Sequence, residues 1–294
     1  MKKHKTSEAD VFDLDGTVIG SNILKGLVMG LDTEIKSKKQ GYYPAKKKLK
    51  FQKLLNSGRE PKLSVGFEPD PSQGNVISLV ESGFFIGMKV DHVKERIYAG
   101  MDQILQTRND FTQLLILALR RRKPRRLIIC ITGTPHEIAN AICPFFGFDF
   151  AIGCMYAQSS GIYTDGKSNL DSGLNKGKVM DELSRDCGIV WKDAIALGDS
   201  PFDLEMFERS KYPIAINPNK KLQKIIRTTR NPNWVNGTIP WIDHIEGDAL
   251  EGVHIWLPNN QGLLTETYVN SLLPEDVINV MSDIYEERLN GCYL

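Results

Sequence analysis

Short apolar runs that alternate with helix-like stretches constrain this sequence more than any other feature. Four runs are clear, namely Val11–Phe12, Leu127–Ile131, Ala194–Leu197 and Pro213–Ile216, and a weaker fifth falls around 150–157. Helical patterns fit between them at 136–146, 177–187, 202–209 and 219–228. Apolar strands that alternate with helices are typical of a parallel sheet covered on both faces. We therefore predict an α/β fold with a Rossmann-like three-layer core and a mainly parallel sheet.

More than a hundred residues separate the first two apolar runs, and this stretch has helical patterns of its own. A simple βαβ crossover is much shorter, so we predict an inserted, mostly helical cap domain over residues 22–125. The core then consists of residues 1–21 and 126–235. After Trp234 the α/β rhythm stops, which predicts an acidic C-terminal extension over 236–294 with a helix at 274–289.

Charge is distributed unevenly along the chain, although its formal net value is only +1. Residues 22–125 contain 20 Lys/Arg against 10 Asp/Glu, whereas residues 236–294 contain one Arg against 10 acids. Two segments are especially basic, Lys36–Lys53 and Arg120–Arg126. The opposite charges suggest that the acidic extension docks on the insertion. A solvated surface, or contact with an anionic or lipid surface, are the other interpretations of the basic segments, and no specific nucleic acid is predicted.

The apolar runs, the N-terminal residues and the cysteines indicate the cellular location that we expect for this protein. Its longest aliphatic run, Leu114–Leu119, is about a third of the ~20 residues that a membrane span requires, so we do not predict a transmembrane protein. Acids interrupt the N-terminus before a signal-peptide core could form. The five cysteines have no C-x-x-C spacing, which favours reduced thiols and a cytoplasmic location.

Polar residues stand where the predicted strands end, and this is where open parallel sheets bind their ligands. The positions are Asp13 and Asp15, then Thr132 and Gly133, then Asp199 and Asp203. Two carboxylates side by side could divide the work of nucleophile and general acid/base. Four converging carboxylates would repel one another without a cation, and oxygen ligands suit Mg²⁺.

Groups that could bind an anion complete the set. Thr132 and Gly133 offer a hydroxyl and a backbone N–H at the start of a helix, a favourable place for a phosphate. Lys176 begins the helix before the fourth run and could neutralise phosphate charge, with Lys178 as its competitor. Each motif alone has an ordinary structural explanation as a turn or a helix cap. Together, at successive strand ends, they predict phosphoryl transfer to a carboxylate.

The combination resembles the haloacid dehalogenase (HAD) superfamily in its phosphoserine-phosphatase-like branch. The first family motif, D-x-D-x-T, matches Asp13, Asp15 and Thr17. The second motif matches Thr132, the third matches Lys176, and the fourth, G-D-x-x-x-D, matches Asp199 and Asp203 in GDSPFD. The resemblance covers about residues 8–22 and 126–235. In this branch a helical cap lies between the first two motifs, where the long insertion falls.

The resemblance implies a phosphomonoester hydrolase that works through an aspartyl-phosphate. Asp13 would attack phosphorus, and Asp15 would protonate the leaving alcohol and then activate water. Mg²⁺ would be held by Asp13, the backbone carbonyl of Asp15, and Asp199, with Asp203 assisting. Thr132, Gly133 and Lys176 would bind the phosphoryl oxygens. The expected substrate is a small phosphorylated metabolite or a lipid phosphate.

One departure from the family bears on the substrate. Phosphoserine phosphatases carry a glutamate shortly after the first motif, and this sequence has Asn22 there. A neutral amide is a poor partner for a buried ammonium group. Asn22 therefore becomes a candidate specificity residue for a substrate other than phosphoserine.

Three other functions compete with the phosphatase. A phosphotransferase would use the same aspartyl-phosphate, and a non-catalytic anion- or lipid-binding protein could share the fold. A nucleotide-binding protein is suggested by residues 161–168, GIYTDGKS, which fit the P-loop pattern G-x-x-x-x-G-K-[ST]. A working P-loop opens a helix, but turn-forming residues follow this one, so we predict a hairpin there and regard the match as accidental.

Overall fold

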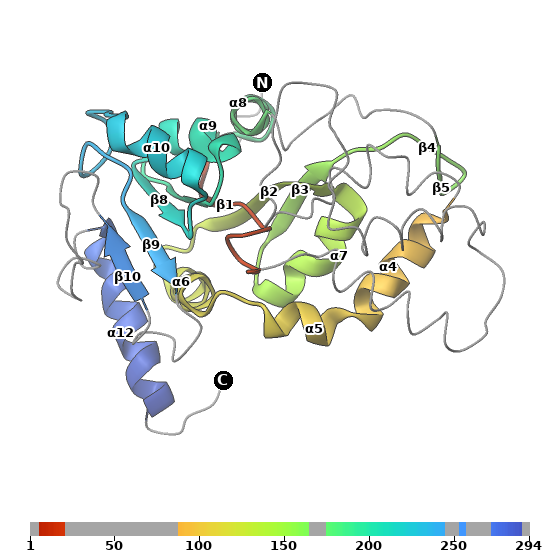
Figure 1. The fold of residues 1–294 in the computed structure, drawn as a ribbon, viewed down its shortest axis with the longest axis horizontal. Coiled ribbons are helices and arrows are strands. Elements are labelled where there is room, and N and C mark those ends of the chain that lie inside the picture. Colours follow the sequence, from red (N-terminus) through yellow and green to blue (C-terminus); the bar gives the residue numbers. More distant parts are fainter. Residues whose placement is uncertain (1–5, 21–87, 165–174, 245–252, 257–271, 290–294) are drawn as a thin grey trace.

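The computed structural model describes residues 6–20, 88–164, 175–244, 253–256 and 272–289 (Figure 1). Within these residues, eight strands form one sheet in the order β10-β9-β8-β7-β1-β2-β3, with β6 paired to β1. The strands are β1 Ser7–Phe12, β2 Leu127–Pro135, β3 Phe150–Cys154, β6 Ile189–Val190, β7 Ile195–Gly198, β8 Tyr212–Ile216, β9 Trp241–His244 and β10 Val253–Trp256. Only the β9–β10 pair is antiparallel among the pairs of this sheet that the structure describes. The predicted mainly parallel sheet is confirmed.

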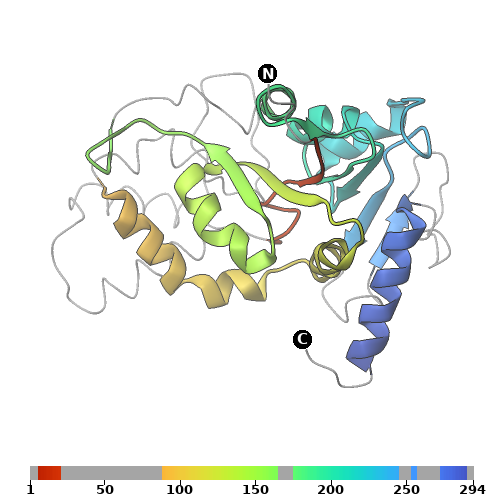
Figure 2. The same ribbon diagram turned by 180° about the vertical axis from the view of Figure 1, so that it is seen from behind.

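Helices cover both faces of this sheet (Figures 1 and 2). They are α4 Val90–Ala99, α5 Met101–Gln106, α6 Asp110–Arg121, α7 His136–Phe146, α8 Lys176–Cys187, α9 Leu204–Glu208, α10 Lys220–Thr228 and α12 Glu275–Leu289. A short 3₁₀ turn, Pro201–Asp203, precedes α9. The helices expected at 136–146, 177–187, 202–209, 219–228 and 274–289 are all present. The three-layer α/β architecture is therefore the observed one.

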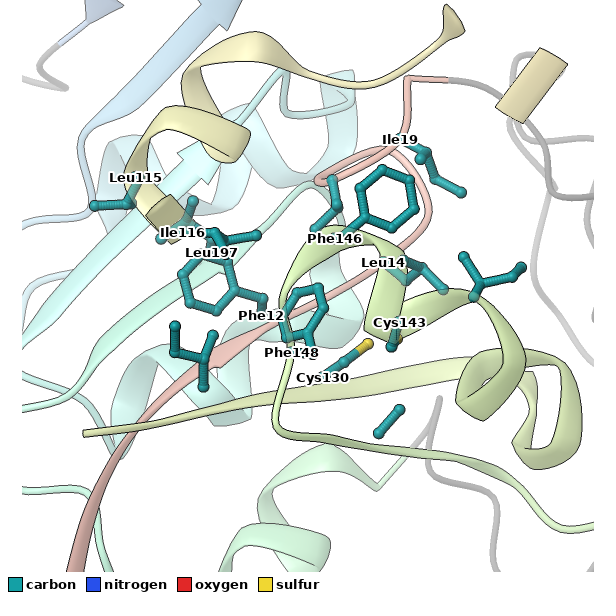
Figure 3. Packing of buried hydrophobic residues seen from close by; sticks show 14 of the residues in the cluster. Phe12, Leu14, Ile19, Leu115, Ile116, Cys130, Cys143, Phe146, Phe148 and Leu197 are labelled. Carbon is teal, nitrogen blue, oxygen red and sulfur yellow. The ribbon is translucent and has the colours of Figure 1, made fainter. Parts of the chain in front are cut away.

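Alternate residues of the central strands serve two separate apolar cores. Phe12 and Cys130 belong to the core beneath α6 and α7, whereas Val11 and Ile129 belong to the core beneath α8, α9 and α10. Figure 3 shows the first core, where Phe12 meets the ring of Phe148 edge-on with the centroids 5.7 Å apart. Because successive side chains of a strand point to opposite faces, a strand buried on both faces is apolar throughout. This explains the continuous apolar runs of the sequence.

The sheet extends further than the sequence pattern indicated. The α/β rhythm was expected to stop after Trp234, but β9 pairs in parallel with β8, and β10 pairs with β9. Short strands with mixed polarity, such as Trp241–His244, give little apolar signal. The second strand was expected to end at Ile131, yet β2 continues to Pro135 because it pairs with β3 again beyond a register shift.

The described end of the insertion packs onto the core. Helices α4, α5 and α6 place buried side chains such as Ile97, Ile104 and Leu115 in the same apolar cluster as Phe12. Residues 21–87, which include Asn22 and the lysines of Lys36–Lys53, lie outside the described residues. A separate cap domain over 22–125 stays a prediction.

Helix α12 lies against α6, so the acidic segment does meet basic residues (Figure 2). Arg121 pairs with Glu287 at 3.0 Å and Arg122 with Asp276 at 2.5 Å. The other arginines of Arg120–Arg126 are also used internally: Arg120 donates to the Gly147 carbonyl, Arg125 pairs with Asp149, and Arg126 pairs with Glu8 and Asp10. This cluster gives no support to the predicted lipid or anionic-surface contact. No described helix is long and apolar enough to cross a membrane.

Candidate active site

The middle of the sheet determines where the predicted site residues meet. Strand β1 lies between β2 and β7, and the chain continues outward through β3 on one side and through β8 and β9 on the other. In open parallel sheets, ligands bind beyond the carboxyl ends of the strands at such a change of direction. Asp13 follows β1 and Asp199 follows β7, and the Asp13 N–H donates to the Leu197 carbonyl at 2.9 Å. The two aspartates therefore emerge side by side.

A compact cluster of one lysine and three carboxylates occupies this position. Asp13, Asp199 and Asp203 each place a carboxylate oxygen within 4.8 Å of the others. The Lys176 Nζ lies 2.6 Å from Asp13 Oδ1 and donates to Asp203 Oδ1 at 2.5 Å. All four residues are buried. The structure thus brings together four of the predicted site residues and selects Lys176 rather than the exposed Lys178.

Burial and mutual repulsion dominate the electrostatics of the cluster. Burial raises the pKa of Asp13 to about 7, against the attraction of Lys176, and Asp203 and Asp15 add to the rise. Burial, followed by the charges of Asp203 and Asp13, raises the pKa of Asp199 well above its usual value. Burial alone would lower the pKa of Lys176, but Asp13 and Asp203 outweigh it and hold that pKa above its usual value. Lys176 therefore stays protonated, and its single positive charge faces the three carboxylates of Asp13, Asp199 and Asp203.

Asp203 is held by the loop in which it lies. Its Oδ2 accepts hydrogen bonds from the Asp199 N–H at 3.0 Å, the Ser200 N–H at 2.9 Å and the Ser200 hydroxyl at 3.0 Å. Its Oδ1 accepts from Lys176. Ser200 and Asp203 cap the first turn of the following helix reciprocally. Asp203 therefore fixes both the loop that presents Asp199 and the side chain of Lys176.

Asp15 approaches the cluster through a tight turn that needs glycine. Gly16 has a φ of +80°, a conformation that side chains disfavour, and a Cβ there would lie 2.2 Å from Asp199 Oδ2. The Asp15 carboxylate is half-buried, and its Oδ2 accepts a hydrogen bond from the Thr134 hydroxyl at 2.6 Å. The first motif and the fourth motif therefore touch at Gly16.

The predicted anion-binding residues line the neighbouring strand. Thr132 is buried in β2, and its hydroxyl oxygen accepts from the Thr134 N–H at 3.2 Å. Gly133 follows, and α7 begins at His136, so its N-terminus faces the carboxyl end of the sheet. A helix N-terminus favours an anion. Asn22, the candidate specificity residue, lies outside the described residues.

The donor chemistry of the cluster fits Mg²⁺. Carboxylate oxygens are the protein ligands that Mg²⁺ prefers, and Asp13 and Asp199 provide them on adjacent strands. Only a hydrogen side chain at Gly16 leaves room beside the Asp199 carboxylate. An unscreened excess of buried negative charge is costly, and a divalent cation would remove that cost. Asp13 and Asp199 could hold the ion directly, with Asp203 behind them.

The segment that imitates a P-loop has a different structure where it is described. Strands β4 Gln158–Ser159 and β5 Ile162–Tyr163 form an antiparallel hairpin. Ser160 and Gly161 make its turn with positive φ angles of 51° and 72°. The predicted hairpin is confirmed, while Lys167 and Ser168 lie outside the described residues.

Comparison with known proteins agrees with this geometry. A family model described as haloacid dehalogenase-like hydrolase matches residues 154–237, which include Lys176, Asp199 and Asp203. A solved protein of unknown function from Bordetella pertussis has the same fold, with a TM-score of 0.54 at 17% identity over 76% of this chain and 96% of that one. Residues 154–237, less than a third of the chain, are thus similar in sequence to the haloacid dehalogenase-like hydrolases. A substrate-bound phosphoserine phosphatase is similar at 19% identity, with a TM-score of 0.47 over 75% of this chain and 90% of that one.

Two curated relatives are similar to part of this chain. A protein from Mycobacterium leprae, named as a hydrolase, is 28% identical over 136 residues, or 46% of this chain and 41% of the relative. A phosphoglycolate phosphatase from Methanosarcina acetivorans is 27% identical over 77 residues, or 26% of this chain and 34% of the relative. The aligned part is thus less than half the length of either relative.

Sequence reasoning missed one residue of the site, Thr134. The second strand was predicted to end at Ile131, so Thr134 was assigned to the connection between that strand and the following helix. The signal was nevertheless present, because alternate residues of a strand share a face. Had the strand been extended, Thr134 would have been placed on the same side as Thr132.

Proposed function

We propose that this chain is a Mg²⁺-dependent phosphomonoester hydrolase that works through an aspartyl-phosphate on Asp13. The observation that carries the proposal is the contact of Asp13 with Lys176, beside Asp199 and Asp203, at the carboxyl ends of adjacent central strands. A nucleophilic carboxylate needs a positive partner to approach a negatively charged phosphate. The names of the two curated relatives, a hydrolase and a phosphatase, agree with this chemistry.

Each residue has a role that follows from its surroundings. Asp13 attacks phosphorus, and the bond from phosphorus to the leaving oxygen breaks as the bond to Asp13 forms. Asp15, two residues further on, donates a proton to that leaving oxygen. It then accepts a proton from the water that attacks the aspartyl-phosphate and releases inorganic phosphate. Lys176, with the hydroxyl of Thr132 and the N–H of Gly133, binds the phosphoryl oxygens.

Asp13, Asp199 and the backbone carbonyl of Asp15 would hold Mg²⁺ directly. Asp203 would assist from behind these ligands. When bound, the ion supplies electrostatic stabilisation of the negative charge that gathers on the transferred phosphoryl group. Asp203 has both oxygens engaged by Lys176 and by its own loop. Its main contribution is therefore to fix the lysine and the position of Asp199.

The proposed substrate is a small phosphomonoester. Asp13, Asp199, Asp203 and Lys176 are buried, whereas Asp15 beside them is half-exposed. One relative is named for phosphoglycolate, and a small anionic ester of this kind suits a cluster presented by Lys176. Asn22 remains the proposed specificity residue, in place of the acid expected for an amino-group-bearing substrate.

The test is phosphate release from a panel of small phosphomonoesters, with Mg²⁺ and with EDTA. Wild type should release phosphate only with Mg²⁺. Asp13→Asn should lower kcat by at least about 10³-fold, because the amide side chain cannot replace the carboxylate as the nucleophile. Wild-type release that survives Asp13→Asn would identify another nucleophile. Added alcohols show whether a phosphotransferase product appears in place of inorganic phosphate.

Two matched substitutions test whether the buried Lys176, and not the exposed Lys178, acts in the reaction. Lys176→Met should lower kcat by about 10²-fold or more, because it removes the cation beside the nucleophile. Lys178→Met, two residues away on the same helix but exposed, should leave kcat within about twofold of wild type. Equal effects of the two changes would contradict the assignment of Lys176.

A further inference from the structure

Thr134 carries a buried hydroxyl that donates a hydrogen bond to Asp15, the proposed acid/base residue. Its side chain is 1% exposed, and its hydroxyl lies 2.6 Å from Asp15 Oδ2. This length is typical of a hydrogen bond from a hydroxyl to an ionised carboxylate, which is about twice as strong as a neutral one. Thr134 and Asp15 are 119 positions apart in the sequence, so the contact joins two separate motifs across the β1–β2 pair.

The backbone that presents Thr134 is held on both sides. Strand β2 shifts register between Ile131 and Pro135, where it resumes pairing with Cys154. Register shifts near active sites redirect side chains. On the far side Gly153 packs so closely that a Cβ there would lie 2.2 Å from the Thr134 carbonyl oxygen, and the Gly153 N–H donates to His136 Nδ1 at 3.3 Å. On the near side the Thr134 N–H donates to Thr132 Oγ1.

Asp15 needs such an anchor more than its neighbours in the cluster. Asp13 and Asp203 are buried and contact Lys176, whereas Asp15 is half-buried on a turn beside Gly16. A carboxylate at the rim of a site can rotate about two side-chain bonds, and proton transfer requires one orientation within hydrogen-bond reach of the reacting oxygen. A hydroxyl fixed to the sheet restricts that rotation.

We propose that Thr134 is a positioning residue that holds the Asp15 carboxylate in the orientation needed for proton transfer to and from the substrate. The inference rests on the proposed phosphatase function. Thr134 touches neither phosphate nor nucleophile in this role. It connects the rigid β2–β3 edge to the acid/base group, so that the strand which binds the phosphate also orients the group that gives the proton.

The first measurement compares Thr134→Val, Thr134→Ser and Thr134→Ala with wild type on para-nitrophenyl phosphate and on glycerol 3-phosphate. Thr134→Val should lower kcat by about 10–100-fold with KM changed less than about threefold, since misorientation of a catalytic group costs rate more than binding. The loss should be greater for glycerol 3-phosphate, because an alkoxide needs the proton more than a nitrophenolate does. Thr134→Ser should retain most of the wild-type kcat.

The second measurement places Thr134→Val in an Asp15→Asn background. Without the carboxylate there is nothing to orient, so the second substitution should cause little further loss. Thr229→Val is the matched control, because it removes a threonine hydroxyl that donates at 2.8 Å to a helix carbonyl far along the chain. This control should keep the wild-type kcat.

The possible outcomes separate this inference from the proposed function. A wild type that hydrolyses no ester overturns both. An active wild type with an equally active Thr134→Val overturns only the role of Thr134, and so does full additivity with Asp15→Asn. If Thr134→Val fails to fold, the Ser and Ala variants decide, because they differ from each other only in the hydroxyl. A Ser variant as slow as the Ala variant contradicts the inference.

Discussion

At the scale of single residues, buried charge is concentrated in two places with different purposes. The cluster around Lys176 lies at the open end of the sheet, where a ligand can reach it. The other is Asp10, in the middle of β1, whose carboxylate lies 3.4 Å from the Arg126 Nε and accepts from the Ile195 N–H at 2.9 Å. Asp10 is fully buried, and Arg126 is 4% exposed. This pair fastens β1 to the residues that precede β2 and β7.

Asp10 gives the protein a predictable response to pH. Burial raises its pKa from 3.8 to about 6, against the attraction of Arg126. The folded state therefore holds this proton more tightly than the unfolded state, and the contribution of Asp10 to stability declines as pH rises from about 4 to about 6. The difference between these pKa values corresponds to about 3 kcal/mol.

The measurement is urea unfolding of wild type and Asp10→Asn from pH 4 to pH 7. As pH rises, the free energy of unfolding of the variant should gain about 3 kcal/mol relative to wild type. Asp193→Asn is the control, because a hydrogen bond from Lys211 lowers the pKa of Asp193 and its difference from wild type should therefore stay nearly constant above about pH 4. A constant difference between wild type and Asp10→Asn would show that Asp10 does not titrate in this range.

The residues of the site could be named from sequence because their chemistry is local. Asp13, Asp15, Thr132 and Asp199 each follow an apolar run, and parallel strands must end at the same edge. The motif favours Lys176 over Lys178, and in the structure Lys176 is buried beside Asp13 whereas Lys178 is exposed. Thr134 and Asp10 were missed for another reason. Strand alternation places Thr134 on the same side as Thr132, but no local pattern specifies its pairing with Asp15, or that of Asp10 with Arg126, because these partners are more than a hundred positions away.

At the scale of elements, α6 and α12 are joined both by apolar side chains and by ion pairs between basic and acidic residues. Val277, Met281 and Ile284 are the buried face of α12. Arg122 and Asp276 lie at the border of that face, with 15% and 50% of their side chains exposed. Apolar burial fixes the helix, and the ion pairs set its direction and register on α6.

A double-mutant cycle on Arg122 and Asp276 measures the worth of this pair. We expect a coupling free energy of about 0.5–1 kcal/mol at low salt, which is the upper range for exposed ion pairs, and a much smaller value in 1 M salt. Arg185 and Asp186 are the control, since both side chains are more than half exposed and their coupling should be close to zero. Coupling that is insensitive to salt would mean that the pair acts through packing.

Elements with strong periodicity were predictable, and the edge of the sheet was not. Helices α7, α8, α10 and α12 begin and end within two residues of their predicted positions. Strands β9 and β10 were missed because each is only four residues long and mixes polar with apolar residues, which gives little apolar signal. They become strands through pairing in the folded protein: β9 pairs with β8, for example Trp241 with Ala215, and β10 pairs with β9.

At the scale of the whole molecule, the C-terminal segment is part of the folded core and does not behave as an appendage. Leu272, Leu273, Val277, Met281 and Ile284 are all buried in the cluster that contains Phe12. Burying side chains of this size contributes about 1.5–3 kcal/mol each. Their sum is comparable to the 5–15 kcal/mol that stabilises a typical domain.

Removal of residues 272–294 should therefore unfold the protein, as judged by the loss of its cooperative urea transition. A salt-sensitive regulatory tail would instead leave a folded enzyme with higher activity at low salt. Point variants calibrate the result: Ile284→Ala should cost about 2–5 kcal/mol because it leaves a cavity. The exposed Asn279→Ala, on the opposite face of α12, should cost less than about 0.5 kcal/mol. A truncated protein that keeps its transition would contradict this view.

The position of β1 has a consequence for how the protein is made. Strand β1 lies in the middle of the sheet, but it is synthesised before the partners on either side of it, β2 and β7, which begin at Leu127 and Ile195. At a synthesis rate of about 5–20 residues per second, roughly 10–40 seconds pass before the second partner exists. During that time Val11 and Phe12 have no sheet to join. Asp13, the proposed nucleophile, is thus synthesised well before its neighbours in the cluster, which is complete only when Asp203 has emerged.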